Sequence, residues 1–187
     1  MILGGTYNPV HTGHLYLAEE IRSQFDYEQI IFVASNIPAH KDHDPCTSPD
    51  HRLEMLRSAT ANTDIIVDDC EIRRGGVSYT HETLKHLHDT YTITGKPGLV
   101  IGDDLVEGLS EWRNWNRWKD GVDLIIAHRM HKERIECPYR HSYVENLILP
   151  ISSSDIRRRV LEGKTFRYLV PEEVYEIIIR ESLYKEC

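Results

Sequence analysis

The chain has 187 residues, of which 40% are apolar and 28% charged, a balance typical of folded globular proteins and not of disordered or collagen-like chains. A chain of this length falls in the range of one domain and can bury roughly 70% of its unfolded surface. The 22 Lys and Arg residues against 30 Asp and Glu residues give a formal net charge of −8. This charge does not favour nucleic acid or an anionic membrane as a partner, so any phosphate ligand needs a local site.

Short apolar stretches alternate with helical patterns along the chain, which is typical of an α/β protein with a parallel sheet and crossover helices. Strands are expected at residues 1–3, 30–34, 65–67, 99–101, 124–127 and 147–149, and helices at residues 14–25, 50–60, 80–89, 105–118, 155–162 and 172–183. Ser48 with Pro49 predicts one helix start, and Pro171 followed by two glutamates predicts the last. We therefore predict one doubly wound, Rossmann-like domain over residues 1–187, with about six parallel strands and helices on both faces.

The apolar stretches are far shorter than the roughly 20 residues that cross a bilayer. The N-terminus lacks the basic and apolar regions of a signal peptide. We therefore expect a protein of the cytoplasm without a membrane partner. The four cysteines, Cys46, Cys70, Cys137 and Cys187, form no C-x-x-C pair, and we expect reduced thiols. The oligomeric state is left open by these features.

The segment from Gly4 to His14 follows the first expected strand and enters a helix, the place where open α/β sheets bind ligands. Gly4 and Gly5 let a ligand approach the backbone, and Thr6 adds a hydroxyl group. A Gly-Gly pair alone more often marks a tight turn. However, His11 and His14 lie at a helix start, where imidazole and backbone N–H groups can donate to phosphate. The segment is neither a Walker loop nor a dinucleotide fingerprint, so it indicates another kind of nucleotide site.

This segment resembles the H-x-G-H signature of the nucleotidylyltransferase superfamily. In its longer form it resembles the bacterial nicotinate-nucleotide adenylyltransferases, with Tyr7 and Asn8 in place of Phe and Asp. Four further segments match that family in order: residues 37–41, residues 76–84, Gly102 to Asp104 with Trp112, and residues 151–157. Chance is a poor explanation for five motifs in this order.

The resemblance implies an enzyme of NAD biosynthesis that transfers the adenylyl group of ATP to nicotinate mononucleotide, giving nicotinate adenine dinucleotide and pyrophosphate, with Mg²⁺. Because the acceptor phosphate is already a nucleophile, the enzyme has to align the substrates and neutralise charge. Catalysis is implied for His11, His14, Lys41 and Arg157; ATP binding for Gly4, Gly5, Thr6, His14, Lys41, Ser152, Ser153, Ser154 and Arg157; and acceptor binding for Ser78, Tyr79, Thr80, Asp104 and Trp112. Mg²⁺ is expected on phosphates and water, so no protein ligand is assigned to it.

Other functions stay open. The acceptor could be nicotinamide mononucleotide or phosphopantetheine, or the chain could be a nucleotide-sensing module without catalysis. Ser78 to Thr80 and Trp112 favour a pyridine acceptor and, through the helix start, its acid over its amide. The presence of His14 and Arg157 argues against a nucleotide pocket without catalytic activity.

Several side chains have less specific interpretations. Residues 40–44 could hold a metal, although five adjacent loop residues rarely all reach one ion. His86 and His88 are expected to be ordinary surface or boundary residues, because they cannot share a helix face. The three-residue spacing of Trp112, Trp115 and Trp118 indicates core packing more than ligand stacking.

Overall fold

The main sheet has six parallel strands, as the sequence predicts. The computed structural model describes residues 1–39 and 47–186. The strands are β1 (Ile2–Gly5), β2 (Ile31–Ala34), β4 (Ile66–Asp68), β6 (Gly98–Gly102), β7 (Asp123–Ala127) and β8 (His141–Val144). Their order is β4-β2-β1-β6-β7-β8, and Ile2 of β1 aligns with Ile31 on one side and Leu99 on the other. The order reverses at β1, so the predicted doubly wound arrangement is confirmed.

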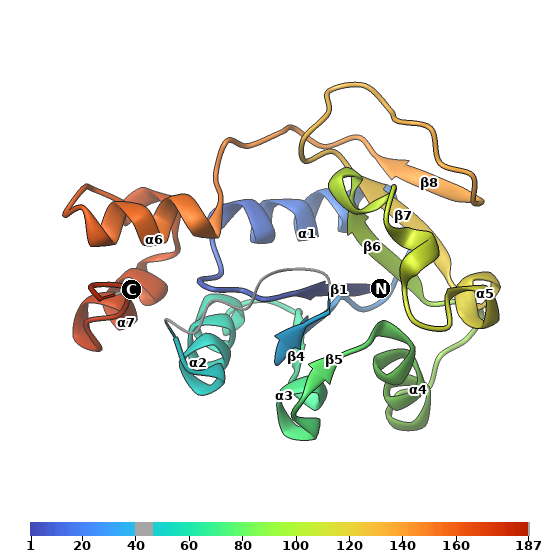
Figure 1. The fold of residues 1–187 in the computed structure, drawn as a ribbon, viewed down its shortest axis with the longest axis horizontal. Helices are drawn as coiled ribbons and strands as arrows, with labels where there is room; N and C mark the ends of the chain where they lie inside the picture. Colours follow the sequence, from blue (N-terminus) through green and yellow to red (C-terminus); the bar gives the residue numbers. More distant parts are fainter. Residues whose placement is uncertain (40–46, 187) are drawn as a thin grey trace.

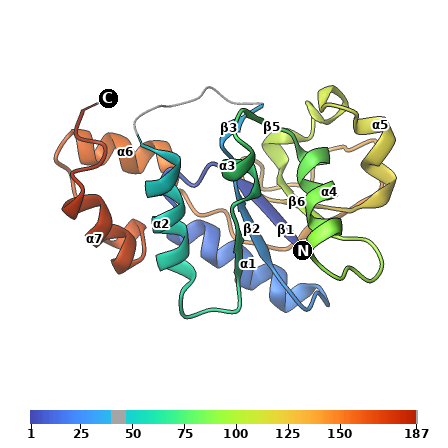
Figure 2. The same ribbon diagram turned by 90° about the horizontal axis from the view of Figure 1, so that it is seen from below.

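Helices cover both faces of this sheet. The core on one face contains residues of α1 (Thr12–Gln24), α2 (Pro49–Thr60), α6 (Ser153–Leu161) and α7 (Glu172–Arg180), and the core on the other contains residues of α3 (Cys70–Arg74) and α4 (Thr80–Thr90). Figure 1 shows α1 and α4 on opposite sides of β1, and Figure 2 views the molecule from the α4 side. No helix within residues 1–39 and 47–186 is long and apolar enough to cross a membrane.

Successive residues of the central strands enter opposite cores. In β2, Phe32 lies in the core beneath α1, whereas Ile31 and Val33 lie in the core beneath α4. Because both faces are covered, these strands are continuous apolar runs without alternation. This is the pattern from which the sequence identified them.

The sixth strand was placed wrongly by the sequence. It is β8 at residues 141–144, not residues 147–149. In β8 only Tyr143 and Val144 are buried, and His141 and Ser142 gave no apolar signal. The apolar residues 147–149 instead follow β8 without regular secondary structure, and Leu147 is 70% exposed. Residues 141–144 form a strand because they pair with β7. A local apolar pattern does not reveal such pairing.

The expected helix over residues 105–118 is broken into short turns. These are η1 (Asp103–Leu105), η2 (Leu109–Glu111), α5 (Trp115–Trp118) and η3 (Lys119–Gly121). Asn114, at φ +61°, interrupts the helical backbone before α5. A further 3-10 turn, η4 (Arg167–Leu169), and a two-stranded sheet of β3 (Ile37–Pro38) and β5 (Val77–Ser78) complete the fold. The short α3, β3 and β5 had no counterpart in the sequence prediction.

The two predicted helix starts are confirmed. Ser48 caps α2, with its side chain accepting a hydrogen bond from the His51 backbone N–H and Pro49 in the first position. Helix α7 begins directly after Pro171. It ends at Arg180, earlier than the expected residue 183, because Ser182 has a φ of +53° that a helix cannot contain. Among the described cysteines, Cys70 and Cys137 are free thiols.

A buried arginine joins α2 to the carboxyl ends of β1 and β2. Arg52 is only 2% exposed. Its Nη1 donates to the carbonyl oxygens of Thr6 and Ser35 at 2.7 and 2.6 Å, and its Nη2 donates to that of Asn36 at 3.2 Å. These carbonyls follow the last residues of the two strands. The guanidinium therefore satisfies polar backbone groups at the carboxyl edge of the sheet.

We expect Arg52→Lys to lower the free energy of unfolding by about 3 kcal/mol, because an ammonium group cannot hold three carbonyls in the geometry of a guanidinium and leaves buried acceptors unsatisfied. Urea denaturation followed by circular dichroism measures the change. The matched control is Arg57→Lys on the same helix, whose exposed side chain pairs with Asp69. That variant should change stability by no more than about 0.5 kcal/mol. Equal effects in the two variants would show that Arg52 is not a structural anchor.

Candidate active site

A cavity of about 640 Å³ opens at the carboxyl ends of β1 and β6. Its volume is in the usual range for small-molecule sites, and its position is the point where the strand order reverses. Most of the residues that the sequence singled out line it: Gly4, Gly5, Thr6, His11, His14, Ser78, Thr80, Trp112, Ser152, Ser153, Ser154 and Arg157. Tyr79 and Asp104 are not among the lining residues. Lys41 and the possible metal ligands of residues 40–44 lie outside the described residues.

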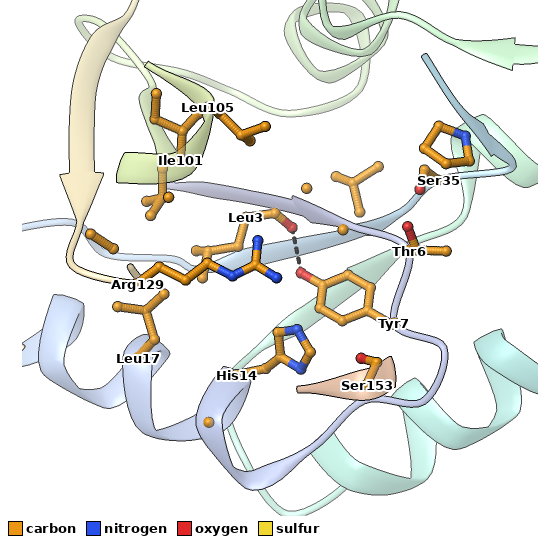
Figure 3. Close-up of a pocket in the computed structure, with 18 of the residues that line it drawn as sticks. Leu3, Thr6, Tyr7, His14, Leu17, Ser35, Ile101, Leu105, Arg129 and Ser153 are labelled. Carbon is orange, nitrogen blue, oxygen red and sulfur yellow. Dashed lines mark hydrogen bonds between the residues drawn. The ribbon is translucent and has the colours of Figure 1, made fainter. Parts of the chain in front are cut away.

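The loop after β1 is shaped around the Tyr7 side chain (Figure 3). Tyr7 is 3% exposed and has a φ of +48°. Its hydroxyl donates to the Leu3 carbonyl at 2.7 Å, and its ring stacks on Phe32 and meets the His14 ring edge-on. A Cβ at Gly5 would lie 3.0 Å from the Tyr7 ring. Glycine is therefore needed here because the ring covers the backbone closely.

His11 and His14 come together at the start of α1. Their rings stack with centroids 3.7 Å apart, and Nδ1 of His14 accepts a hydrogen bond from the His11 backbone N–H at 3.2 Å. Nδ1 of His14 is therefore the acceptor, which places the proton of the neutral ring on Nε2. Burial, with a smaller contribution from the positive charge of Arg129, lowers the pKa of His11 to about 4. The predicted pair is thus assembled, and His11 is a neutral imidazole at neutral pH.

Helix α6 docks its first turn onto the same loop. Nη1 of Arg157 donates to the Asn8 carbonyl at 2.8 Å, and the Ser153 hydroxyl donates to the Pro9 carbonyl at 2.8 Å. Ser152 caps the helix by accepting from the Asp155 N–H at 3.1 Å. These contacts bring residues about 145 positions apart in sequence into one wall. The N-terminus of α6, with its serine side chains, therefore faces the cavity beside the start of α1.

Asn8 has a structural role that explains its side chain. It is 3% exposed, and its Oδ1 accepts a hydrogen bond from the Tyr184 hydroxyl at 2.8 Å. The position therefore requires an acceptor, which an amide supplies as well as a carboxylate does. The absence of the carboxylate common in the resembling family does not remove this contact.

The opposite wall carries a buried carboxyl group that the sequence did not indicate. Glu71 of α3 lines the cavity, accepts a hydrogen bond from the Thr83 hydroxyl and bonds to Ser78. Burial raises the pKa of Glu71, although these two hydrogen bonds partly oppose the shift. Ser78 also accepts from the Asn36 N–H at 2.9 Å. A short helix between two strands gave no recognisable signal for Glu71 in the sequence.

Aromatic residues close this side of the cavity. Trp112 is 8% exposed and packs against Trp115 and Trp118, with ring centroids about 6 Å apart. The expected core packing of the tryptophans is confirmed, and Trp112 also reaches the cavity. Tyr79 instead has the Arg113 guanidinium 4.5 Å from its ring centroid. Tyr79 therefore lies between the lining residues Ser78 and Thr80 in the chain without lining the cavity itself.

The two aspartates after β6 differ in their binding partners. Asp103 is 2% exposed and accepts hydrogen bonds from the backbone N–H groups of Met130 and His131, both at 2.9 Å. Burial raises the pKa of Asp103, but backbone hydrogen bonds outweigh this effect and hold the pKa below its usual value. Asp104 forms an ion pair with Arg129 at 2.9 Å. Asp103 thus fixes the turn after β7, and Asp104 holds the residue that enters the site.

Arg129 is the cationic group that sequence reasoning missed. It follows β7 by two residues, and Figure 3 shows its side chain extending into the cavity towards Tyr7 and His14. Its position after the carboxyl end of a parallel strand was a usable signal, because all such ends meet at one edge of the sheet. The misassigned segment 147–149 also lines the cavity. Apolar residues there form part of the cavity wall, where a strand had been expected.

Comparisons with known proteins agree with this architecture. A family model described as cytidylyltransferase-like matches residues 2–159. A Borreliella burgdorferi protein named probable nicotinate-nucleotide adenylyltransferase is 41% identical over 184 residues, covering 98% of this chain and 95% of the relative. A Treponema pallidum protein of the same name is 35% identical over 199 residues, covering 98% of each chain.

Solved structures share the fold. One is the Plasmodium falciparum nicotinic acid mononucleotide adenylyltransferase complexed with NaAD, with a TM-score of 0.73, 21% identity and coverage of 98% of this chain and 95% of that one. The same enzyme complexed with APC has a TM-score of 0.71, with the same two coverages. The full-length identities and the matched family model decide the assignment. The chain belongs to the cytidylyltransferase-like family and, within it, to the nicotinate-nucleotide adenylyltransferases.

Proposed function

We propose that the cavity at the carboxyl ends of β1 and β6 transfers the adenylyl group of ATP to the phosphate of nicotinate mononucleotide, releasing pyrophosphate. One observation carries this proposal. The starts of α1 and α6 converge on one cavity, where they bring His14 and Arg157 together. Helix N-termini, an imidazole and a guanidinium are groups that bind a polyphosphate and the negative charge that develops as it leaves. The names of the full-length relatives support the same reaction.

The ATP phosphates would lie along the wall formed by α1 and α6. His14 would donate to the α-phosphate, where the charge changes most during the transfer, and neutral His11 would donate from the same helix start. Arg157 and the serines of α6 would bind the outer phosphates, with Lys41 assigned there by resemblance only. Gly4, Gly5 and Thr6 would allow the nucleotide to approach the backbone, and the apolar segment 147–149 would pack against the base.

Mg²⁺ would arrive with ATP and neutralise phosphate charge. The donor set suits this arrangement, because the carboxyl group of Glu71 that lines the cavity is already engaged by Thr83 and Ser78. Mg²⁺ prefers oxygen ligands and keeps several waters, so phosphate oxygens and water suffice to hold it. We therefore assign no protein ligand to this ion. A cytoplasmic location for the reaction also stays a prediction from the sequence.

The acceptor would occupy the wall formed by Ser78, Thr80 and Trp112. Thr80 is the first residue of α4, so its hydroxyl and the N–H groups of the first helical turn are donors suited to a carboxylate. Glu82 in the same turn forms an ion pair with Arg74 at 3.1 Å. This pairing reduces the repulsion that Glu82 would exert on an anionic ring substituent. Trp112 would contact the pyridine ring.

We expect His14→Ala to lower kcat by at least about two orders of magnitude with a much smaller change in KM, because the lost donor acts mainly as charge moves onto pyrophosphate. Pyrophosphate release under saturating substrates measures kcat, and circular dichroism verifies the fold. His88→Ala on the exposed side of α4 is the control and should retain full activity. Turnover of His14→Ala above a third of the wild-type value would remove His14 from catalysis.

Arg157→Lys should impair ATP binding and turnover by about tenfold or more, although it keeps the charge. A lysine cannot bind the Asn8 carbonyl and a phosphate oxygen together with the planar geometry of a guanidinium. Steady-state titration with ATP at fixed acceptor measures the effect. Arg158→Lys is the control, since Arg158 is a neighbour that pairs with Asp155 and does not line the cavity. Wild-type kinetics in Arg157→Lys would disprove the bidentate role.

The choice of acceptor tests the function itself. Pyrophosphate release should be fastest with nicotinate mononucleotide, about ten- to a hundredfold above nicotinamide mononucleotide in kcat/KM. The amide would direct its NH₂ group at other donors, and an unmet buried donor costs about 1–3 kcal/mol. Phosphopantetheine should give no release above background. Thr80→Val should reduce the preference for the acid, because it removes one donor and keeps the backbone N–H groups. A preference for the amide, or for phosphopantetheine, would contradict the proposed acceptor.

A further inference from the structure

A second group of chemically reactive side chains lies where β4 meets α3 and α4. Asp68 is the last residue of β4, Cys70 is the first residue of α3, and His86 lies in the middle of α4. One ligand atom from each of the three side chains lies within 4.8 Å of those of the other two. None of the three residues lines the cavity of the proposed active site. The group is therefore separate from the adenylyl-transfer chemistry.

Hydrogen bonds hold the carboxylate of this group in place. Oδ1 of Asp68 accepts from the Cys70 backbone N–H at 2.8 Å, and Oδ2 accepts from the Tyr91 hydroxyl at 3.0 Å. Nε2 of His86 is 3.2 Å from the same Oδ2. The side chains of Asp68 and His86 are 4% and 29% exposed, so an ion from solvent could enter past the imidazole. The side chains are fixed by the fold before any ligand binds.

The carboxylate of this group is buried beside an imidazole. In the part of the chain that the structure describes, Asp68 forms an ion pair with the His86 ring alone, at 3.2 Å, and this ring is charged only when protonated. Buried carboxylates in proteins are paired with cations or coordinate metals, so a cation bound between the carboxylate and the imidazole would be stabilised here.

We propose that Asp68, Cys70 and His86 bind one divalent cation of the Zn²⁺ type. Carboxylate, thiolate and imidazole are the three ligand classes that Zn²⁺ combines in proteins, whereas Mg²⁺ and Ca²⁺ require oxygen ligands. On binding, the Cys70 thiol releases its proton to solvent and the imidazole binds as a neutral ligand. Two negative ligands then balance the two positive charges of the ion. Water completes the tetrahedral coordination.

Such an ion would connect β4, α3 and α4, and the last of these begins with Thr80 of the proposed acceptor wall. It would tie the edge strand β4 to α3 and α4, which are also joined on the cavity side by the hydrogen bond between Thr83 and Glu71. Glu71 is the chain neighbour of Cys70. The bound metal would therefore stabilise the segment that presents Ser78 and Thr80, without taking part in the reaction.

Cobalt titration of the full chain after chelator treatment tests the site without an activity assay. Co²⁺ should bind with one equivalent per chain and produce the visible bands of a tetrahedral ion together with thiolate-to-cobalt charge-transfer absorption. Zn²⁺ should displace it and remove the colour. Zn²⁺ should also raise the Tm of the wild-type protein. The absence of stoichiometric Co²⁺ binding would overturn the proposal.

Variants locate the ion. Cys70→Ser should abolish the charge-transfer absorption, and His86→Gln, at a partly exposed position that tolerates change, should weaken Co²⁺ binding at least about tenfold and remove the Zn²⁺-dependent rise in Tm. Cys137→Ser and His88→Gln are matched controls on residues outside the group and should bind as the wild type does. Charge-transfer absorption that survives Cys70→Ser, or equal loss in the control variants, would place the metal elsewhere and refute the site. Either outcome leaves the proposed adenylyl transfer unaffected.

Discussion

Backbone carbonyl groups of the loop between β1 and α1 are held by arginines from two distant helices, and the geometry of the active site depends on these bonds. Arg52 of α2 holds the Thr6 carbonyl at 2.7 Å, and Arg157 of α6 holds the Asn8 carbonyl at 2.8 Å. The loop that these bonds hold leads into α1, which places His14 at the cavity. Because each guanidinium is fixed by its own helix, the loop is placed by tertiary contacts and not by its own turn preference. Such preorganisation is what a reaction limited by alignment requires.

Arg157 has a structural role and a proposed role in binding substrate. It joins α6 to the loop, and it would also contact the phosphates. A residue with both tasks couples substrate binding to the position of the loop, since a phosphate that draws the guanidinium also draws the Asn8 carbonyl. The Tyr184 hydroxyl limits this movement, because it donates to the Asn8 side chain from beyond α7. The C-terminal segment thus takes part in the site although it lies outside every motif.

The sequence predicted the parts of this protein that are encoded locally. Continuous apolar runs identified the central strands because both of their faces are buried, and His11 and His14 were recognised because they share one short segment. The features it missed are made by contacts between distant segments. Strand β8 is polar in its first half and is stabilised by pairing with β7, and Arg129 is placed in the cavity by the turn that Asp103 holds. Apolar periodicity reveals neither relation; for Arg129 the usable signal was its position two residues after the end of β7.

The wall that we propose for the acceptor places a buried carboxyl group, that of Glu71, beside the position of an anionic ligand. A fully ionised Glu71 would repel a carboxylate on the pyridine ring. Burial moves its pKa upwards, towards the neutral form, while the hydrogen bonds with Thr83 and Ser78 occupy its oxygens on the cavity side. The carboxyl group thereby fixes the start of α4 relative to β5. Its residual charge acts against the positive end of α4 at Thr80. The proposed preference for an acid over an amide would therefore be set by the balance between the N-terminus of α4 and the buried carboxyl group of Glu71.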